Sequence, residues 1–450
     1  MRHDIAVQDY RDFGENLGKY KVGATHVPVY RKDGQLDAYL AFPIPDFSMV
    51  ADKGNITLVG SSYMASVRHN SYSINGAIKF GNKAKFAPSY YLINRNASTV
   101  SSVDFNLPRL NKVVTDAAPV ATVDKSTIRK GDRNRYTWYA RVGAGYQLQV
   151  SDDQKSEISI TDAYRWKTGG TMANATVTLQ GGTLRWKNVG PTDPNSSPFS
   201  NATRPGDSGS PVFVYDTVDK IWRLAGVHHA AISNGGIYDR VSGEEYIPDG
   251  YLDRVLAMNT SAPVNDKASD GVLYWQPDAI TQTDHSWDWQ GLNQKYRDLA
   301  PSAASQAELD ATKDLTFRGE GNTLRLTDSV NLGAGKLQFS GDYTVESEQG
   351  KQATSVGGGI EVDEGKNVLW KVNGLKDDAL HKIGAGTLEI QGTGVNQGAL
   401  NVGDGLVILN QQPDNSGAVQ AFSTVTLMSG RPTVRPWTRL ERRTESCREW

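Results

Sequence analysis

Short β-type segments alternate with turn residues along most of this chain, and this pattern constrains the fold more than any other feature. In residues 1–262, runs such as ITLVGSSYMASV and PVFVYDTVDKIWRLAGV are rich in Tyr, Val and Thr and are separated by Gly, Asn and Asp. Helical spacing of apolar residues is rare there. Short strands at this density are typical of a β-barrel or a β-sandwich. The first region is therefore predicted to be all-β.

A second pattern covers residues 313–434. Each unit there is a short alternating strand introduced by a Gly-rich turn, as in GAGKLQFSGDYTV and GAGTLEIQGTG. A right-handed parallel β-helix needs this recurrence, because its coils stack strand on strand and its turns need residues that adopt positive φ. We therefore predict the start of a β-helical stalk. A β-sandwich has the same local pattern and remains the alternative.

Residues 263–312 and 435–450 fit neither pattern. The first segment places several Trp among Asp, Gln and Ser before PSAASQAELDATKD, and it is predicted to be an irregular connector with one short helix. From residue 431 onward the sequence RPTVRPWTRLERRTESCREW contains six Arg and no Gly. A solvated basic tail and a non-native end both remain open interpretations of residues 435–450.

Composition excludes several classes of partner. Charged residues make up 22% of the chain and the formal net charge is −2, which gives no reason to expect nucleic acid or an anionic membrane as a partner. No apolar run approaches the roughly 18 residues of a membrane-spanning helix, and MRHDIAVQDY lacks the hydrophobic segment of a secretion signal. The chain as written is therefore expected to be soluble and not to insert in a membrane.

Cys447 is the single cysteine of the chain. A single cysteine excludes an internal disulfide and a cysteine zinc site, and it makes a Cys–His nucleophile pair not credible. We predict no metal or cofactor. A low number of cysteines is consistent with a reducing cytosol. It is equally consistent with a protein that must cross a membrane unfolded. The cysteine count alone does not choose between these locations.

The sequence GDSGSP carries the strongest chemical signal. A serine hydroxyl becomes a good nucleophile only when a base removes its proton and donors stabilise the oxyanion. Gly206 allows its own N–H and that of Ser208 to point at one spot, which would form an oxyanion hole, and Gly209 allows a substrate backbone to come close. An ordinary turn leading into the strand PVFVYD is the alternative.

A base and an orienting carboxylate can be assigned from the flanking sequence. His69 ends the segment ITLVGSSYMASVRHN in a His-Asn turn, which would place its ring at the mouth of a barrel. Asp104 directly precedes the alternating apolar residues of DFNLPRL, where it could also simply cap a turn. The order His69, Asp104, Ser208 is that of the chymotrypsin-like barrels.

At these residues the chain resembles the passenger of a serine protease autotransporter, in the immunoglobulin A protease-like family of Gram-negative bacteria. The stretches that carry the resemblance are YRDFGENLGKYKVGATHVPVY, ASVRHN, DFNLPRLNKVVTDAAP, GDSGSPVFVYD, ALHKIGAGTLEIQGTG and GDGLVILNQQ. The resemblance covers about residues 8–434, and the last two stretches are most similar to the enterobacterial branch.

The resemblance implies a chymotrypsin-like double β-barrel protease in residues 1–262, followed by a partial β-helix. It implies His69 as general base, Asp104 as its orienter and Ser208 as nucleophile. It also implies a secreted, virulence-type endopeptidase that is exported through the periplasm and outer membrane and cleaves host proteins. Glycoproteins are among the expected host substrates, and the chain is expected to be a monomer. The signal peptide and the translocator barrel of the family are not found in this sequence.

The same resemblance assigns a substrate pocket. Counting by analogy, Ala202 lies at its base, and His229, Ala230 and Ala231 form a wall. None of the four is acidic, so the pocket lacks a counter-ion for Lys or Arg and favours a small or apolar side chain. His228 and His229 could be a metal-binding pair, but neighbouring strand residues point to opposite faces, which argues against it.

Two rival functions fit parts of the sequence. In an adhesin, the β-helix surface would bind host glycans or proteins and proteolysis would be secondary, yet an adhesin has no need of His69, Asp104 and Ser208 together. A cytosolic housekeeping protease does not explain the repeat stalk. The sequence does not identify the natural substrate.

Overall fold

The computed structural model describes most of the chain in two units. The described residues are 1–70, 76–81, 87–94, 103–130, 133–180, 183–233, 237–238, 240–258, 260–261, 265–267, 273–275, 314–318, 322–326, 329–374, 378–391, 398–410, 422, 424–427 and 433–436. One compact unit lies within Met1–Met258, and the other is formed by the described residues from 260 onward.

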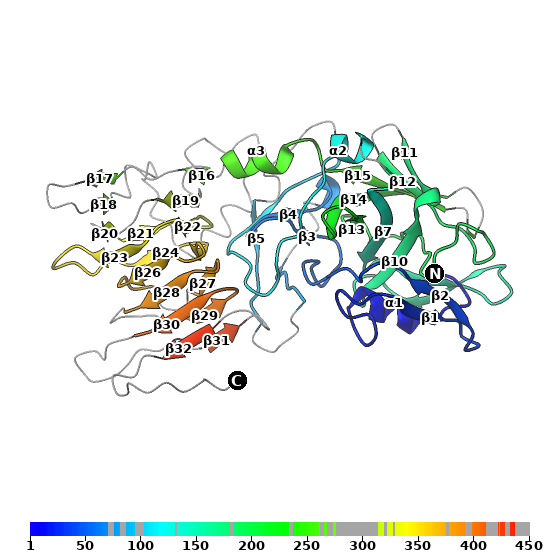
Figure 1. Ribbon diagram of the computed structural model, residues 1–450, viewed down its shortest axis with the longest axis horizontal. Helices are drawn as coiled ribbons and strands as arrows, with labels where there is room; N and C mark the ends of the chain where they lie inside the picture. The colour runs from blue at the N-terminus through cyan, green and yellow to red at the C-terminus, as the bar shows by residue number, and fades with distance from the viewer. Residues whose placement is uncertain are drawn as a thin grey trace. The chain divides into compact units, whose positions relative to one another are not determined.

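One antiparallel sheet of seven strands dominates the first unit, in the order β10-β7-β13-β14-β15-β12-β11 (Figure 1). Its strands are β7 (Tyr136–Gly143), β10 (Thr168–Ala173), β11 (Val177–Gln180), β12 (Thr183–Lys187), β13 (Pro211–Asp216), β14 (Ile221–Ser233) and β15 (Arg240–Tyr246). Strand β13 is buried along its whole length, as expected from its apolar sequence. Pro211 is tolerated because it is the first residue of the strand.

The other described strands of this unit pair two by two. The pairs are β1 (Val27–Tyr30) with β2 (Leu36–Leu40), β3 (Thr57–Leu58) with β4 (Met64–Ala65), β5 (Leu92–Asn94) with β6 (Arg109–Leu110), and β8 (Gln147–Val150) with β9 (Glu157–Thr161). Residues 71–75, 82–86 and 95–102, which separate several of these strands, lie outside the described part. The described pairings confirm the all-β class but do not define two closed barrels, so the double barrel stays a prediction.

Short helices complete the first unit. They are α1 (Val7–Gly14), α2 (Lys125–Lys130), α3 (Tyr251–Met258) and the 3₁₀ turns η1 (Arg68–Asn70) and η2 (Asn174–Thr176). The ring of Phe13 on α1 stacks on that of Phe199 at a centroid distance of 5.0 Å. Tyr20 and Phe47 meet Phe13 edge to face. This aromatic cluster holds the segment around Phe199 against the first helix.

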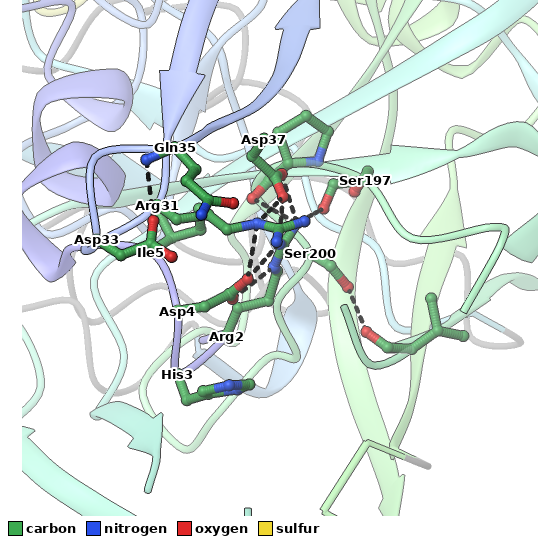
Figure 2. Close-up of polar contacts among 12 residues, drawn as sticks. Arg2, His3, Asp4, Ile5, Arg31, Asp33, Gln35, Asp37, Ser197 and Ser200 are labelled. Atoms are coloured by element: carbon green, nitrogen blue, oxygen red, sulfur yellow. Dashed lines mark hydrogen bonds and ion pairs between the residues drawn. The ribbon is translucent and has the colours of Figure 1, made fainter. Parts of the chain in front are cut away.

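Arg2 forms a second anchor for the same segment (Figure 2). Its buried guanidinium donates hydrogen bonds to both carboxylate oxygens of Asp4 and to both of Asp37, at 2.6–2.9 Å. It also donates to the carbonyl oxygen of Ser197 at 3.3 Å. Asp37 accepts a further bond from Arg31 at 2.9 Å. The two carboxylates compensate the buried charge, and the N-terminal segment is thereby tied to residue 197.

The second unit is a parallel β-helix. Its seven-stranded sheet contains β16 (Thr260–Ser261), β19 (Asp314–Phe317), β22 (Lys336–Phe339), β25 (Gly359–Val362), β27 (Leu380–Ile383), β29 (Ala399–Val402) and β31 (Thr424–Leu427). Its eight-stranded sheet contains β17 (Asn265–Lys267), β18 (Leu273–Trp275), β20 (Asn322–Leu326), β23 (Tyr343–Ser347), β26 (Asn367–Trp370), β28 (Thr387–Ile390), β30 (Leu406–Leu409) and β32 (Thr433–Pro436). Between these sheets lies the pair β21 (Val330–Asn331) and β24 (Ser355–Val356).

From β19 to β32 the chain alternates between the two sheets, and each strand pairs in parallel with the next one in its own sheet. The stacked strands run from yellow to red in Figure 1. Parallel pairing of this kind confirms the predicted β-helix and makes the β-sandwich alternative wrong, because a sandwich of hairpins is antiparallel.

Side chains of successive coils stack in columns. Val345, Trp370, Ile390 and Leu409 occupy equivalent positions in consecutive strands, and the first three are buried. The turns between coils use positive φ, as at Gly384 with a φ of 81° and Gly405 with a φ of 74°. The Gly-rich sequence thus supplies the turns, and the alternating apolar residues supply the core.

Two predicted boundaries differ from the structure. Strands β17 and β18 lie inside the segment 263–312 that was predicted to be an irregular connector, and β18 pairs in parallel with β20. These strands have only three residues each and no Gly-rich turn beside them, so the repeat pattern missed them. The predicted short helix lies outside the described residues. At the other end, β32 extends to Pro436, two residues into the predicted tail, and the rest of that tail is not described.

Lys382 departs from the apolar rule of the β-helix core. Its position aligns with Ile360 on one side and Val402 on the other, and it is completely buried. Its ammonium group donates hydrogen bonds to the carbonyl oxygens of Gly386 at 2.7 Å and Asp404 at 2.8 Å. Burial lowers the pKa of Lys382 to about 8, although the charges of Asp404 and Glu361 oppose this shift.

The pKa of Lys382 predicts a pH-dependent stability of the β-helix. Between pH 8 and 10.5 the unfolded chain binds more protons at this lysine than the folded chain, so the free energy of unfolding rises with pH in that window. We expect the free energy of unfolding, measured with urea, to rise by about 1–2 kcal/mol between pH 8 and pH 9.5. The variant Lys382→Met removes the titrating group and should lose this gain. Equal pH slopes for the two proteins would contradict the prediction.

Candidate active site

The turn Gly206–Ser210 leads directly into β13 and has an unusual backbone. The φ of Gly206 is 92° and that of Gly209 is 85°, which is the left-handed region where side chains are strained. A Cβ on Gly206 would lie 2.7 Å from the Cβ of Ala163. A Cβ on Gly209 would collide with the carbonyl oxygen of Asn55. Both glycines of GDSG are therefore required by this turn.

Asp207 anchors the turn in the sheet. Its carboxylate accepts hydrogen bonds from the backbone N–H of Gly145 and of Arg204, each at 2.8 Å. It also forms an ion pair with the guanidinium of Arg141 on β7 at 3.0 Å, where the two side chains are 5% and 2% exposed. The carbonyl of Asp207 accepts the N–H of Ser210 at 2.8 Å. The residue preceding Ser208 is thus held from three sides.

The predicted base and orienter are in direct contact. The Nδ1 atom of His69, in η1, lies 2.5 Å from Oδ2 of Asp104, and the backbone N–H of His69 donates to Oδ1 at 3.0 Å. An antiparallel bridge between Ser66 and Asn106 brings the two segments side by side. Asp104 therefore holds both the ring and the backbone of His69, which is the arrangement that keeps an imidazole in one orientation.

Burial and hydrogen bonding act on Asp104 in opposite directions. Partial burial raises the pKa of this carboxyl, whereas the two hydrogen bonds from His69 and the charges of His69 and His229 lower it. The net pKa lies below the usual value. Asp104 therefore remains ionised at neutral pH.

Asn70 connects the histidine segment to the serine. Its side-chain amide donates a hydrogen bond to the carbonyl oxygen of Ser208 at 2.5 Å. A Cβ on Gly209 would lie 3.1 Å from the same amide nitrogen. Because Asn70 follows His69 directly, this contact brings the His69–Asp104 pair beside the turn that carries Ser208. All three residues predicted from the sequence thus lie in one region.

Strand β14 passes on the other side of the turn. The N–H of Gly209 donates to the carbonyl of His228, and the N–H of His228 donates to the carbonyl of Ser210, both at 2.8 Å. The predicted pocket residues follow on this strand, with His229 and Ala230 half-buried and Ala231 exposed. The predicted base of the pocket, Ala202, is buried.

A buried pair lies beside these pocket residues. The register of β14 against β15 shifts between His228 and Ala230, so a bulge interrupts the regular alternation at His229. His228 Nδ1 lies 2.8 Å from Oε1 of Glu244, and both side chains are buried. Burial is the main cause that holds the pKa of His228 well below its usual value. Glu244 is an acidic residue near the pocket that the sequence did not reveal, because it comes from the adjacent strand.

The sequence reasoning missed three supporting residues, Asn70, Arg141 and Asp207. Two of them had a signal in the sequence, since Asn70 follows the histidine and Asp207 is the second letter of GDSG. Arg141 had none, because its partner is 66 positions away in the chain.

Among the described residues, no three His, Cys, Asp or Glu side chains gather as a metal site. In the same residues, no helix has the length and apolar character to cross a membrane.

The structure thus contains an antiparallel sheet entered by a GDSG turn, a His–Asp pair beside that turn, and a parallel β-helix. This combination defines the class of β-helical serine peptidase passengers.

Comparison with known proteins places the chain in a family. The family model described as immunoglobulin A1 protease matches residues 1–247. The chain is 36% identical to the serine protease SepA autotransporter of Shigella flexneri over 96% of its own length and 31% of that protein. It is 32% identical to the IgA-specific serine endopeptidase autotransporter of Neisseria gonorrhoeae over 96% of its length and 30% of that protein. The chain spans about a third of the length of these curated relatives.

A solved structure supports the same assignment. The crystal structure of the Haemophilus influenzae Hap adhesin matches 98% of this chain and 49% of its own chain, with a TM-score of 0.78 and 30% identity. The chain belongs to the immunoglobulin A1 protease family, and it resembles a fragment of the passengers of serine protease autotransporters. Such a passenger is secreted.

The buried pair Arg141–Asp207 predicts a large stability effect. Replacing Arg141 by Met leaves the carboxylate of Asp207 buried without its cation, so we expect a loss of about 3–5 kcal/mol in the free energy of unfolding. The double variant Arg141→Met with Asp207→Asn removes both charges and should lose less than Arg141→Met alone. Urea unfolding of the three proteins measures the difference. An equal or larger loss in the double variant would contradict the prediction.

Proposed function

We propose that this chain is the catalytic part of a secreted serine endopeptidase that cleaves host proteins through an acyl-enzyme. Ser208 is the nucleophile, His69 the general base and Asp104 its orienter. The observation that carries the proposal is the 2.5 Å contact between His69 and Asp104, held beside the Ser208 turn by Asn70. Family membership supports it, because the named relatives are serine proteases.

In the proposed reaction, His69 removes the proton of the Ser208 hydroxyl while its oxygen attacks the carbonyl carbon of the scissile peptide bond. The N–H groups of Gly206 and Ser208 donate to the oxyanion of the tetrahedral intermediate. Breakage of the C–N bond releases the amine, which takes the proton from His69. Water then attacks the acyl-enzyme by the same route and regenerates Ser208.

The wider features of the proposal follow the family. The protease domain is proposed to be a double barrel within residues 1–258, and the partial stalk is proposed to run from β16 to β32. Ala202, His229, Ala230 and Ala231 are the proposed substrate pocket, which favours a small or apolar side chain. The monomeric state stays a prediction.

A second function has one observation in its favour. The Hap structure that matches this chain is titled an adhesin, with a TM-score of 0.78. In an adhesin, the surface of the β-helix would bind host proteins or glycans, and proteolysis would be secondary.

The proposal predicts an activated serine. A fluorophosphonate probe should label the wild-type protein at Ser208, located by mass spectrometry of the modified peptide, and should not label the variant Ser208→Ala. Circular dichroism of both proteins controls for folding. Absence of labelling in folded wild-type protein would reject the peptidase and favour the adhesin.

The role of Asp104 is tested separately. In Asp104→Asn the amide cannot hold the imidazole in the same tautomer or stabilise the imidazolium, so we expect the labelling rate to fall by about 10³–10⁴-fold. The variant should retain the fold, because the substitution preserves shape. A fall of less than tenfold would show that Asp104 does not orient the base.

A further inference from the structure

Two exposed tyrosines are linked to the segment Pro205–Gly206 at the nucleophile turn. Tyr164 is 50% exposed and Tyr146 is 44% exposed. A Cβ placed on Gly206 would lie 3.6 Å from the Cζ atom of Tyr164, so the phenol ring lies next to the turn. Large exposed aromatic side chains beside a reactive group are typical of a binding surface.

Three consecutive residues connect these tyrosines to the turn. The carbonyl of Ala144 accepts the N–H of Tyr164 at 2.5 Å. The N–H of Gly145 donates to the carboxylate of Asp207. The N–H of Tyr146 donates to the carbonyl of Pro205 at 3.0 Å. The tyrosines and the Ser208 turn therefore share one rigid support.

An ion pair adds a further link between this support and the turn. Glu157 at the start of β9 forms an ion pair with Arg204, which lies just before the turn. Strand β9 pairs with β8, the strand that follows Tyr146. The hairpin that precedes Tyr164 is thus also bound to the nucleophile segment.

The backbone of Tyr164 is strained. Its φ is 65°, in the left-handed region that is rare for a large side chain. Strain of this kind costs about 1–3 kcal/mol and is concentrated at functional sites. Half of the ring is exposed, so burial of Tyr164 in the core does not account for the strained conformation.

The two sides of the turn have different neighbours. Strand β14 and the predicted pocket residues lie on the side of Gly209 and would take the acyl side of a substrate, which is N-terminal to the scissile bond. Ala163 and Tyr164 lie on the side of Gly206. For a polypeptide whose acyl side lies against β14, the leaving-group side would then lie toward Gly206 and Tyr164.

We propose that Tyr164 and Tyr146 form a binding subsite for the leaving-group side of the substrate, selective for polypeptides with an aromatic or aliphatic side chain one or two residues after the scissile bond. This inference rests on the proposed function and names a determinant of its substrate class. The occupant is an extended polypeptide, because the subsite continues directly from the catalytic turn.

The test starts with cleavage profiling of a peptide library by mass spectrometry. Wild-type protein should enrich aromatic and aliphatic residues in the first two positions after the cleaved bond. From the preferred sequence, an internally quenched peptide and a nitroanilide with the same acyl side are then made. The nitroanilide has no residues on the leaving-group side, so it serves as the reference substrate.

The variants are chosen to separate binding from structure. Tyr164→Asn suits the left-handed backbone and should unfold at the same or a higher urea concentration than wild type. For this variant, we expect the ratio of kcat/KM for the quenched peptide to kcat/KM for the nitroanilide to fall about tenfold. The enrichment of aromatic and aliphatic residues after the cleaved bond should disappear. Tyr146→Ser should lower the same ratio in the same direction. Tyr39→Thr, which removes another exposed tyrosine on β2, should leave the ratio unchanged.

Several results would overturn the inference. A wild-type protein without preference after the cleaved bond would do so, as would an unchanged ratio in both tyrosine variants. An equal fall for both substrates would assign Tyr164 a structural role instead. Self-association of the wild type in sedimentation, lost in Tyr164→Asn, would assign the tyrosines to contact between two copies. If folded wild type cleaves neither substrate and takes no fluorophosphonate, the proposed function fails as well, which distinguishes the two failures.

Discussion

The candidate site depends above all on the ion pair between Arg141 and Asp207. A buried carboxylate next to Ser208 is costly unless a cation and hydrogen-bond donors compensate it. Arg141 supplies the cation from strand β7 of the large sheet, and two backbone N–H groups supply the donors. The turn therefore takes its conformation from the sheet, and Ser208 receives a fixed position without using its own side chain.

The remaining parts of the site come from segments that are distant in the sequence. The His69–Asp104 pair is brought together by the bridge between Ser66 and Asn106, and Asn70 joins it to Ser208. Each contact consists of one or two hydrogen bonds, and each bond is worth about 1 kcal/mol on its own. Their combination with the buried ion pair makes the arrangement specific, because no segment can shift without breaking several contacts.

The β-helix follows a simpler rule. Each coil contacts only the next, so local repeats of strand and Gly-rich turn are sufficient to specify the fold. The columns through Val345 and Trp370 show that equivalent residues stack from coil to coil. Lys382 is an exception, since its ammonium group lies in the core and relies on backbone carbonyls for compensation.

The sequence by itself determined the all-β class, the parallel β-helix and the residue types of the site. These properties are encoded locally, in the alternation of apolar residues, the Gly-rich turns and the motif around Ser208. The tertiary structure alone decided the pairing of Arg141 with Asp207, the burial of Glu244 against His228 and the position of Tyr164 beside Gly206. Such contacts join strands and loops far apart in the chain, and no local pattern records which residues will meet.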